Sequence, residues 1–301
     1  MKLSEILKGS EDNFGIYKIL KDREFDSLGL IGAQVDLNLC TFIEDEKYIS
    51  AIGTNTAMII TKPDIAKKIK NKGICISDEP RISFFKLHNY LTGMEVYTGT
   101  EKFETQIGEN SIISPLAYIA NENIKIGKNV IIEEFVSIKE NTIIGDNTII
   151  RAGVVIGGEG FEYKRLKCDG ILSVKHVGWI EIGDSVEIKY NSCIDKAIYP
   201  WDKTIIANNC RISNLVQVSH GVKLGEGVFI TAGSVISGRT IIGDNTWVGV
   251  GATISNGLII GKNSRVNIGS VATKNIEDNT SVSGNFAIDH NKFIKFIKTI
   301  R

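Results

Sequence analysis

The sequence predicts a mainly β protein in which a long stack of short strands follows a small α/β domain and precedes a short terminal helix. Three observations support this class. An aliphatic residue recurs at every sixth position over most of residues 107–272, small residues and glycines keep fixed places beside it, and residues 1–104 lack the repeat. A period of six fits neither a helix, with a period near 3.6, nor a simple strand, with a period near 2.

The repeat is regular enough to define a register. It is clear in residues 126–156, breaks, resumes in 182–194, and then runs without interruption from Ile206 to Val266. The aliphatic positions of this last run are Ile206, Ile212, Val218, Leu224, Ile230, Ile236, Ile242, Val248, Ile254, Ile260 and Val266. So long a run at one spacing indicates a single stacked unit repeated many times.

Two other positions of the repeat carry structural information. Two residues before each aliphatic the side chain is usually small or β-branched, as at Val216, and can fill a narrow interior. Cys210 occupies the same position, so we interpret it as a buried structural thiol. Glycine often follows the aliphatic, as at Gly225 and Gly243, where we expect it to accept strained turn dihedrals. The unit is therefore a short strand, a turn and another short strand.

Residues 1–104 follow a different pattern. AMIIT (57–61) predicts a strand and PDIAKKIK (63–70) a helix with proline in its first turn. GICIS (73–77) predicts a second strand, and DEPRISFFKLHNYL (78–91) predicts a second helix. This segment is therefore expected to form a small α/β domain.

The last residues predict a short amphipathic helix with one basic face. That face is either ordinary solvated surface or a docking strip for an acidic carrier protein. The apolar and basic residues of the helix are Phe293, Ile294, Phe296, Ile297 and Ile300, against Lys292, Lys295, Lys298 and Arg301.

Composition narrows the possible functions. The 301 residues include 35 basic and 35 acidic side chains, so the chain lacks the field that captures nucleic acid or an anionic membrane. The sequence contains no run of about 18 apolar residues, which is what would predict a membrane span. The 5 cysteines are scattered and never form a CxxC pair, which argues against disulfides and zinc. We expect a soluble cytoplasmic protein that binds no nucleic acid.

Four segments carry a resemblance to a known family: TFIEDEKY (41–48), IGGEGFEY (156–163), GWIEIGDSVEIKYNSCIDKA (178–197) and NLVQVSHGVKLG (214–225). Together with the repeat, they resemble the hexapeptide-repeat acyltransferases, in particular the UDP-3-O-(3-hydroxyacyl)glucosamine N-acyltransferases and related N-acyltransferases of nucleotide-linked amino sugars. The resemblance implies a left-handed parallel β-helix of roughly eight triangular coils with about eighteen residues each. It also implies a homotrimer with active sites between neighbouring prisms.

The domain organisation follows from the repeat and the resemblance. We expect an α/β domain that binds nucleotide or substrate at 1–104 and the acyltransferase β-helix at 105–283. A loop inserted at 157–181 would interrupt the β-helix, and the short terminal helix would occupy 284–301.

His220 and Gly238 are the candidate catalytic residues. An amine attacks a thioester only when it is neutral, and the tetrahedral intermediate carries an oxyanion, so the site needs a base and a hydrogen-bond donor. Histidine, with an ordinary pKa near 6.5, suits the first role at neutral pH. At about eighteen residues per coil, Gly238 falls one coil beyond His220. In the family the matching histidine is the general base and the matching glycine contacts the oxyanion, so the resemblance implies both roles.

Asn214 and Gln217 are candidate substrate residues, because their amides lie close to His220 in sequence and can hold either the substrate or the imidazole. If the coil spacing and the resemblance are set aside, His220 would be an ordinary histidine, either on the surface or with its hydrogen bonds satisfied. Gly238 would then be only a turn glycine. The family often has aspartate at the position of Ser213. The serine therefore leaves this chain without that carboxylate beside the base. No three histidines are spaced to converge on a metal ion, so no metal site is expected.

Two further groups of candidate substrate residues rest on the resemblance. It implies a uracil pocket at Phe42, Asp45 and Tyr48, where Asp45 replaces a family asparagine and can accept but not donate hydrogen bonds. The other group matches a family loop that shapes the substrate cleft, with a solvent-exposed loop as the alternative: Gly160, Phe161 and Tyr163.

Three functions remain open. The first is an N-acyltransferase that moves a short or 3-hydroxylated acyl group from CoA or acyl carrier protein to the amine of a UDP- or dTDP-linked amino sugar, for lipopolysaccharide or another surface polysaccharide. The second is the lipid A enzyme itself, which uses a long-chain hydroxyacyl carrier protein. The third is a trimeric β-helix that binds without catalysis. Neither enzyme would need a tightly bound cofactor.

Overall fold

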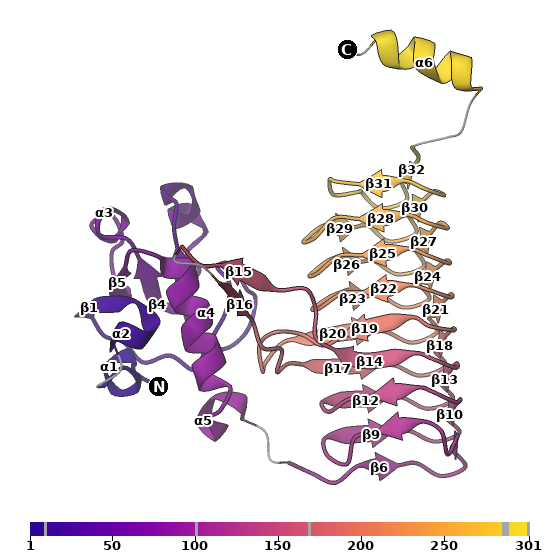
Figure 1. The fold of residues 1–301 in the computed structure, drawn as a ribbon, viewed down its shortest axis with the longest axis horizontal. Helices are drawn as coiled ribbons and strands as arrows, with labels where there is room; N and C mark the ends of the chain where they lie inside the picture. Colours follow the sequence, from indigo (N-terminus) through magenta and orange to yellow (C-terminus); the bar gives the residue numbers. More distant parts are fainter. Residues whose placement is uncertain (9–10, 100–101, 168–169, 285–288, 300–301) are drawn as a thin grey trace. The chain divides into compact units, whose positions relative to one another are not determined.

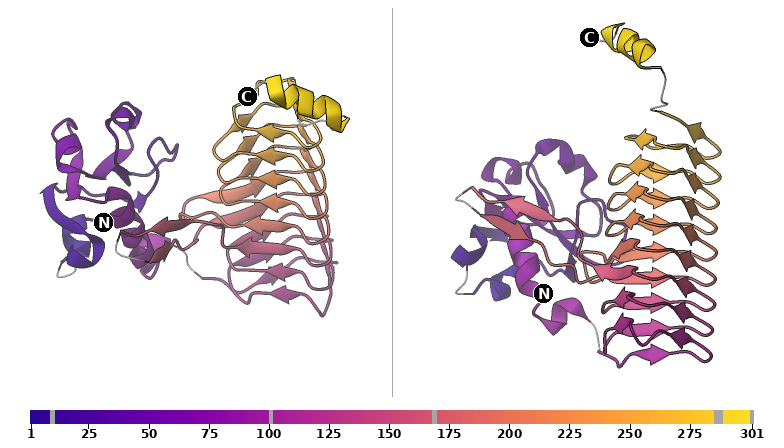
Figure 2. Two further views of the ribbon diagram at one scale, coloured as in Figure 1. Left: turned by 45° about the horizontal axis from the view of Figure 1, so that its top comes forward. Right: turned by 45° about the vertical axis from the view of Figure 1, so that its right-hand side comes forward.

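The computed structural model describes residues 1–8, 11–99, 102–167, 170–284 and 289–299, and it divides the chain into two compact units (Figures 1 and 2). The first unit comprises Met1–Glu101 together with two short segments from later in the chain, Glu159–Gly178 and Ile198–Asp202. The second unit comprises Lys102–Gly158, Trp179–Ala197 and Lys203–Arg301. Among the described residues, no helix is long and apolar enough to cross a membrane.

The second unit is a left-handed β-helix whose three faces are parallel sheets. One face contains β7 (Ile112–Ile113), β10 (Ile131–Ile132), β13 (Ile149–Ile150), β18 (Glu187–Ile188), β21 (Arg211–Ile212), β24 (Phe229–Ile230), β27 (Trp247–Val248), β30 (Arg265–Val266) and β32 (Ser281–Val282). The next contains β8 (Tyr118–Ile119), β11 (Ser137–Ile138), β14 (Val155–Gly158), β19 (Cys193–Asp195), β22 (Gln217–Val218), β25 (Val235–Ile236), β28 (Thr253–Ile254) and β31 (Val271–Ala272). The last contains β6 (Gln106–Ile107), β9 (Ile124–Ile126), β12 (Thr142–Ile144), β17 (Trp179–Ile182), β20 (Lys203–Ile206), β23 (Lys223–Leu224), β26 (Ile241–Ile242) and β29 (Ile259–Ile260).

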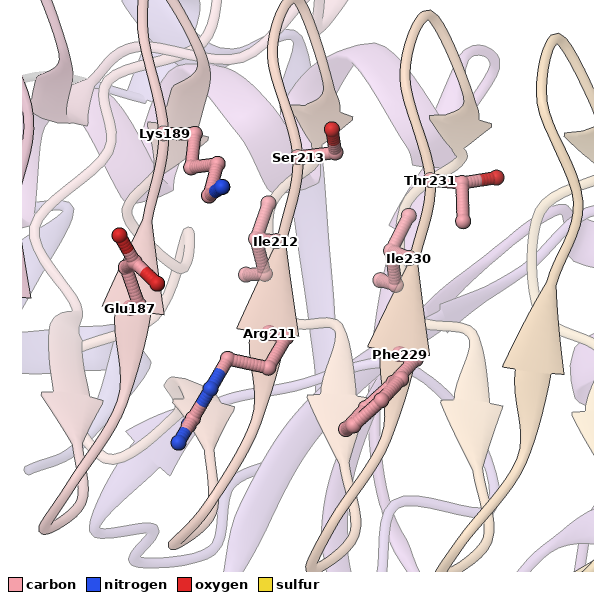
Figure 3. A pocket seen from close by; sticks show the side chains of 8 residues that line it. All are labelled: Glu187, Lys189, Arg211, Ile212, Ser213, Phe229, Ile230 and Thr231. Atoms are coloured by element: carbon pink, nitrogen blue, oxygen red, sulfur yellow. The ribbon is translucent and has the colours of Figure 1, made fainter.

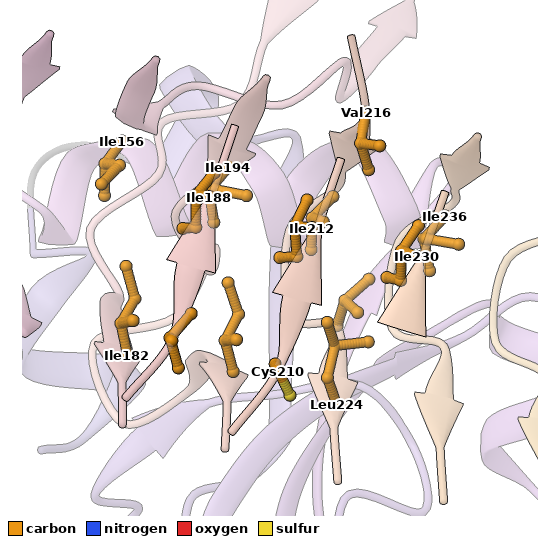
Figure 4. Close-up of a cluster of buried hydrophobic side chains, with 14 of the residues drawn as sticks. Ile156, Ile182, Ile188, Ile194, Cys210, Ile212, Val216, Leu224, Ile230 and Ile236 are labelled. Carbon is orange, nitrogen blue, oxygen red and sulfur yellow. The ribbon is translucent and has the colours of Figure 1, made fainter. Parts of the chain in front are cut away.

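The repeat of the sequence is the register of these sheets. Ile212 pairs with Ile230 on one face, Val218 with Ile236 on the next, and Leu224 with Ile242 on the last. The inward aliphatic side chains therefore stack directly above one another and form a continuous buried core (Figure 4). The predicted eighteen-residue coil is confirmed, and with it the predicted fold class.

The glycines that follow the aliphatic residues make room for the next coil, whereas the sequence predicts them as turn residues. A Cβ atom on Gly225 would lie 2.7 Å from the backbone nitrogen of Asp244 in the next coil, and one on Gly243 would lie 2.6 Å from that of Lys262. These glycines are required because the neighbouring coil approaches too closely for a side chain. The left-handed backbone of the corners occurs two residues later, as at Gly227 (φ 65°) and Asn245 (φ 55°).

The first unit is built on a five-stranded sheet in the order β1-β5-β4-β3-β2. Its elements are α1 (Leu3–Ile6), α2 (Glu11–Phe14), β1 (Ile16–Lys21), β2 (Ser27–Leu28), β3 (Leu39–Ile43), the 3-10 helix η1 (Glu46–Ala51), β4 (Thr56–Thr61), α3 (Pro63–Ala66), β5 (Gly73–Ser77), α4 (Pro80–Leu91) and α5 (Glu95–Thr98). The two strands and two helices expected between 57 and 91 are present. The first of these helices, α3, ends at Ala66 rather than at residue 70.

Two segments that interrupt the β-helix belong to the core of this first unit. The sequence predicts the loop at 157–181 as part of the β-helix domain. In the structure, Glu159–Gly178 forms a hairpin of β15 (Tyr163–Arg165) and β16 (Ile171–Ser173) and clusters with the first unit. The reason is apolar burial, because the core around α4 includes side chains from both insertions: Leu172, Val174, Ile198, Tyr199 and Trp201.

Hydrogen bonds from α4 fasten the hairpin. The Asn89 side chain donates to the Ser173 carbonyl (2.7 Å) and accepts from the Lys175 backbone N–H (2.9 Å). The neighbouring His88 is buried, with Nε2 2.9 Å from the Lys175 carbonyl and Nδ1 2.8 Å from the Tyr97 hydroxyl. A carbonyl only accepts, so Nε2 carries a hydrogen. Burial lowers the pKa of His88 from 6.5 to about 4.

The predicted terminal helix is present as α6 (His290–Thr299). Phe293, Ile294 and Phe296 are exposed on it, beside the basic residues Lys292, Lys295 and Lys298. The expected Ile300 and Arg301 lie outside the described residues.

His88 predicts how stability depends on pH. Its folded-state pKa of about 4 lies below the ordinary 6.5 of the unfolded chain, so its contribution is complete above pH 6.5 and is lost as pH falls from 6.5 toward 4. We expect the free energy of unfolding to fall across that window by on the order of 3 kcal/mol from this group. Urea unfolding of the wild type and of His88→Gln at about pH 7 and about pH 5 measures the difference. An equal pH dependence in the two proteins would contradict the assignment.

Candidate active site

His220 lies at a corner of the β-helix, in the turn between β22 and β23. Its side chain is buried, which is unusual at a corner where most residues are exposed or half-buried. Because Val218 pairs with Ile236, the residue in register with His220 in the following coil is Gly238. The turn is tied to that coil by the Arg239 N–H, which donates to the His220 carbonyl (2.9 Å).

Gly238 lies directly against the imidazole of His220. A Cβ atom added to Gly238 would stand 2.6 Å from Nε2 and 2.9 Å from Cε1 of His220, so any side chain at 238 would displace the ring. Gly238 has no left-handed backbone to explain its glycine, and Asn256 occupies the equivalent position one coil further. The glycine is therefore required by contact with His220. The structure brings the two predicted catalytic residues together.

Asp195 is a further candidate site residue, which the sequence pattern alone does not single out. It ends β19, one coil before His220, and its carboxylate is buried. Gln217 fixes the carboxylate by donating from Nε2 to Oδ2 at 2.7 Å. Burial raises the pKa of Asp195 from 3.8 to about 6, and the hydrogen bond from Gln217 opposes the rise.

A sequence signal for Asp195 did exist. The register places Ser219 and then Ser237 in the same column in the next two coils, so Asp195 is an acidic residue where the following coils have serine. The insertion that follows Asp195 lengthens this coil, and a fixed count of eighteen residues does not align the column.

Asn214 and Gln217 lie on the same face of the β-helix as His220 but make different contacts. Asn214 is exposed at the corner before β22, where its carbonyl accepts from the Gly233 N–H (3.0 Å). Gln217 points outward from β22 itself and is engaged with Asp195. His220 occupies the corner after β22. The three predicted residues therefore border one face, with Asn214 and His220 at its opposite edges, and Gln217 orients Asp195 rather than the imidazole.

A groove lies on the neighbouring face, beside Ser213 (Figure 3). Its volume is about 220 Å³. Arg211 contributes a guanidinium that already donates to the carbonyls of Ser185 (2.6 Å) and Cys210 (3.0 Å). The residues that line the groove are Glu187, Lys189, Arg211, Ile212, Ser213, Phe229, Ile230 and Thr231.

The predicted uracil pocket residues belong to the first unit. Phe42 is half-buried and packs against Phe84, with ring centroids 5.0 Å apart. Asp45 caps η1 by accepting from the Lys47 N–H (3.0 Å), and this bond lowers the pKa of its exposed carboxyl. Tyr48 is exposed, with the Lys47 ammonium 5.0 Å from its ring centroid. Base binding by these residues stays a prediction.

The three loop residues also belong to the first unit. Gly160 is buried, and its carbonyl accepts from the Glu162 N–H (3.0 Å). Phe161 is 89% exposed and makes an edge-to-face contact with Tyr163, their ring centroids 4.9 Å apart. So exposed an aromatic pair is available to a ligand, and the substrate role of these residues stays a prediction.

Other reactive side chains have structural partners. Cys210 is buried, as expected, and its thiol donates to the Gly225 carbonyl (3.1 Å). Burial raises the pKa of Cys210 to about 11, which keeps the thiol protonated. Within the part of the chain that the structure describes, no three histidine, cysteine, aspartate or glutamate side chains gather as metal ligands.

Comparison with known proteins assigns the family. The UDP-3-O-acylglucosamine N-acyltransferase of Campylobacter lari is 32% identical over 269 residues, which cover 83% of this chain and 81% of the relative. The protein of that name from Helicobacter pylori is 30% identical over 281 residues, with 81% and 77% covered. The chain belongs to the UDP-3-O-acylglucosamine N-acyltransferase family. Like the relatives of this family, it is an acyltransferase.

Two further comparisons agree with this family. The bacterial transferase hexapeptide (six repeats) pattern matches residues 123–158 and 203–238, and the second match contains both His220 and Gly238. Among solved structures, a UDP-N-acetylglucosamine acyltransferase from Bacteroides fragilis aligns with a TM-score of 0.54 at 26% identity, covering 60% of this chain and 68% of that one. One from Campylobacter jejuni has the same TM-score at 19% identity, covering 65% and 79%, and shows the shared fold.

The contact between Gly238 and His220 predicts the effect of adding a methyl group. In Gly238→Ala the new Cβ would overlap the imidazole, so the ring must move by about an ångström, and we expect acyltransferase activity to fall on the order of 100-fold. Asn256→Ala, at the equivalent corner one coil further, is the matched control and should retain activity. Full activity in Gly238→Ala, with a wild-type melting temperature, would show that the position of the ring is unimportant.

Proposed function

We propose that the protein transfers an acyl group from a thioester to the amine of UDP-3-O-acylglucosamine, the substrate in the names of its relatives. The observation that carries the proposal is the contact between His220 and Gly238, which puts a base and a bare backbone at one corner of the β-helix. A buried carboxylate one coil away, at Asp195, adds a further polar group.

The reaction follows from these groups. The neutral amine attacks the thioester carbonyl carbon, a carbon–nitrogen bond forms, and the carbonyl oxygen becomes an oxyanion. The His220 imidazole takes the proton from the amine nitrogen, a step that is worth about 10² to 10⁴ in rate. The backbone N–H of Gly238 donates to the oxyanion, on the order of 3 kcal/mol in the transition state. When the intermediate collapses, the carbon–sulfur bond breaks and the thiolate leaves with the proton from the imidazolium.

The donor is an acyl-CoA or an acyl carrier protein, and no tightly bound cofactor is required, because this chemistry needs only a base and a hydrogen-bond donor. An acidic carrier protein fits the basic residues of α6 (Lys292, Lys295 and Lys298). We propose a homotrimer acting in the cytoplasm, as the resemblance of the sequence implies.

A second candidate keeps the reaction and changes the acceptor to another UDP- or dTDP-linked amino sugar, with a short or 3-hydroxylated acyl group. Ser213 favours it, because a hydroxyl there removes the family carboxylate from the corner before β22. Ser213 also lines the groove of Figure 3. The acceptor could therefore differ while the base remains.

Removing the imidazole tests the reaction. His220→Ala should lower the rate of thiol release by about 10² to 10⁴, with a melting temperature close to that of the wild type, because the base is lost while the coil stays intact. The exposed His290 on α6 provides the control, and His290→Ala should match the wild type. Unchanged thiol release in His220→Ala would support a β-helix that binds without this catalysis.

Substrate choice is tested by pairing donors with acceptors. Long-chain 3-hydroxyacyl carrier protein and short acyl-CoA are each incubated with UDP-3-O-acylglucosamine and with a dTDP-linked amino sugar, and thiol release is followed. We expect turnover with the carrier protein and the UDP-linked acceptor. Turnover confined to the dTDP-linked sugar would replace the first candidate by the second.

A further inference from the structure

Thr204 is a buried residue in the coil that precedes the coil of His220. Val218 and Leu224 are six positions apart, whereas the equivalent Ile194 and Ile206 are twelve positions apart. The coil of Ile194 therefore carries an insertion between Lys196 and Thr204. Part of the insertion, Ile198–Asp202, clusters with the first unit. The insertion therefore interrupts the regular coil at the corner equivalent to the turn that holds His220.

The regular corners show what would otherwise occupy that place. At this corner in the following coils, one backbone N–H donates to a carbonyl of the coil before it. Arg239 N–H donates to the His220 carbonyl, and Gly257 N–H donates to the Gly238 carbonyl, each at 2.9 Å. The equivalent donor below them is the Gly221 N–H, whose acceptor in a regular coil would be the carbonyl of Lys196.

The Gly221 N–H bonds instead to the side chain of Thr204. This N–H donates to Oγ1 of Thr204 at 2.8 Å, and the same hydroxyl donates to the Asp195 carbonyl at 2.7 Å. Thr204 is fully buried, so both bonds are shielded from water. The hydroxyl therefore links the strand before the insertion to the residue that directly follows His220.

This bonding differs from that of two other inward hydroxyls, Ser192 and Thr246. Ser192 accepts from the Val216 N–H and donates to the Ser213 carbonyl, so both its partners lie in the next coil. Thr246 likewise accepts from the Ser264 N–H and donates to the Gly261 carbonyl. Thr204 alone among these three reaches back to its own coil across an insertion.

We propose that Thr204 is a positioning residue, whose hydroxyl replaces the coil-to-coil backbone bond that the insertion removes and so fixes the His220 turn against Asp195. The proposal rests on the proposed function of His220 for its effect on rate. Its structural part concerns only the Gly221 amide and stands by itself.

The column that contains Thr204 supplies the test variants. Val222 and Thr240 occupy the same inward position in the next two coils, and both are fully buried. Since valine fits this column naturally, Thr204→Val should fold. Thr204→Ser restores the hydroxyl, and Thr240→Val removes a hydroxyl that bonds only to the Ser255 carbonyl (3.1 Å).

The experiment compares steady-state kinetics and hydrogen–deuterium exchange of these variants. Thr204→Val should lower kcat by about 10- to 100-fold with KM changed less than about threefold, because the base is misplaced while substrate binding is kept. Exchange in the segment 219–223 should accelerate in Thr204→Val. Thr204→Ser should recover both quantities, and Thr240→Val should match the wild type in both.

The outcomes separate this proposal from the proposed function. Wild-type kcat and wild-type exchange in Thr204→Val would overturn the positioning role, as would an equal loss of kcat in Thr240→Val. If the wild type itself transfers no acyl group, the proposed function fails, and faster exchange at 219–223 confined to Thr204→Val still supports the anchoring of the turn.

Discussion

The parallel hydrogen bonds between successive coils are the interaction on which the rest of the β-helix depends. Most of its strands have only two residues, too few to be stable by themselves, so each coil is held by its neighbours and by the aliphatic side chains stacked inside. This ladder fixes the register, and the register places Gly238 against His220. A slip of one residue would reverse inward and outward positions and separate the two.

The same ladder explains how the coil tolerates two insertions. Loops can leave a β-helix at its corners without disturbing the strands, provided that the inward residues on both sides resume their columns. Ile156 and Ile194 pair directly although the first insertion lies between them. The insertions contribute apolar side chains such as Val174 and Tyr199 to the core of the first unit, so both compact units depend on chain segments that are distant in sequence.

The sequence predicted the parts of the fold and site that depend on spacing. An exact repeat of six defines the columns, and the distance of eighteen from His220 to Gly238 follows from it. What it did not predict depends on local contact. The repeat predicts turn dihedrals for its glycines, whereas Gly225 is required by the close approach of Asp244. The repeat does not single out Asp195 or Thr204, because the insertion between them breaks the count that aligns each with its column.

Burying polar groups at one corner of the β-helix costs free energy, and the packing of the regular coils offsets this loss. Asp195 loses hydration, as its raised pKa indicates, and retains only the stabilisation that partners such as Gln217 provide. In a solenoid the free energy of each coil is shared with its neighbours, so one irregular coil can persist between regular ones. The coils beyond His220 keep their backbone bonds and their buried columns, from Ile236 to Val266. The corner proposed to be catalytic therefore lies inside the stack, where regular coils on both sides hold its polar groups in fixed positions.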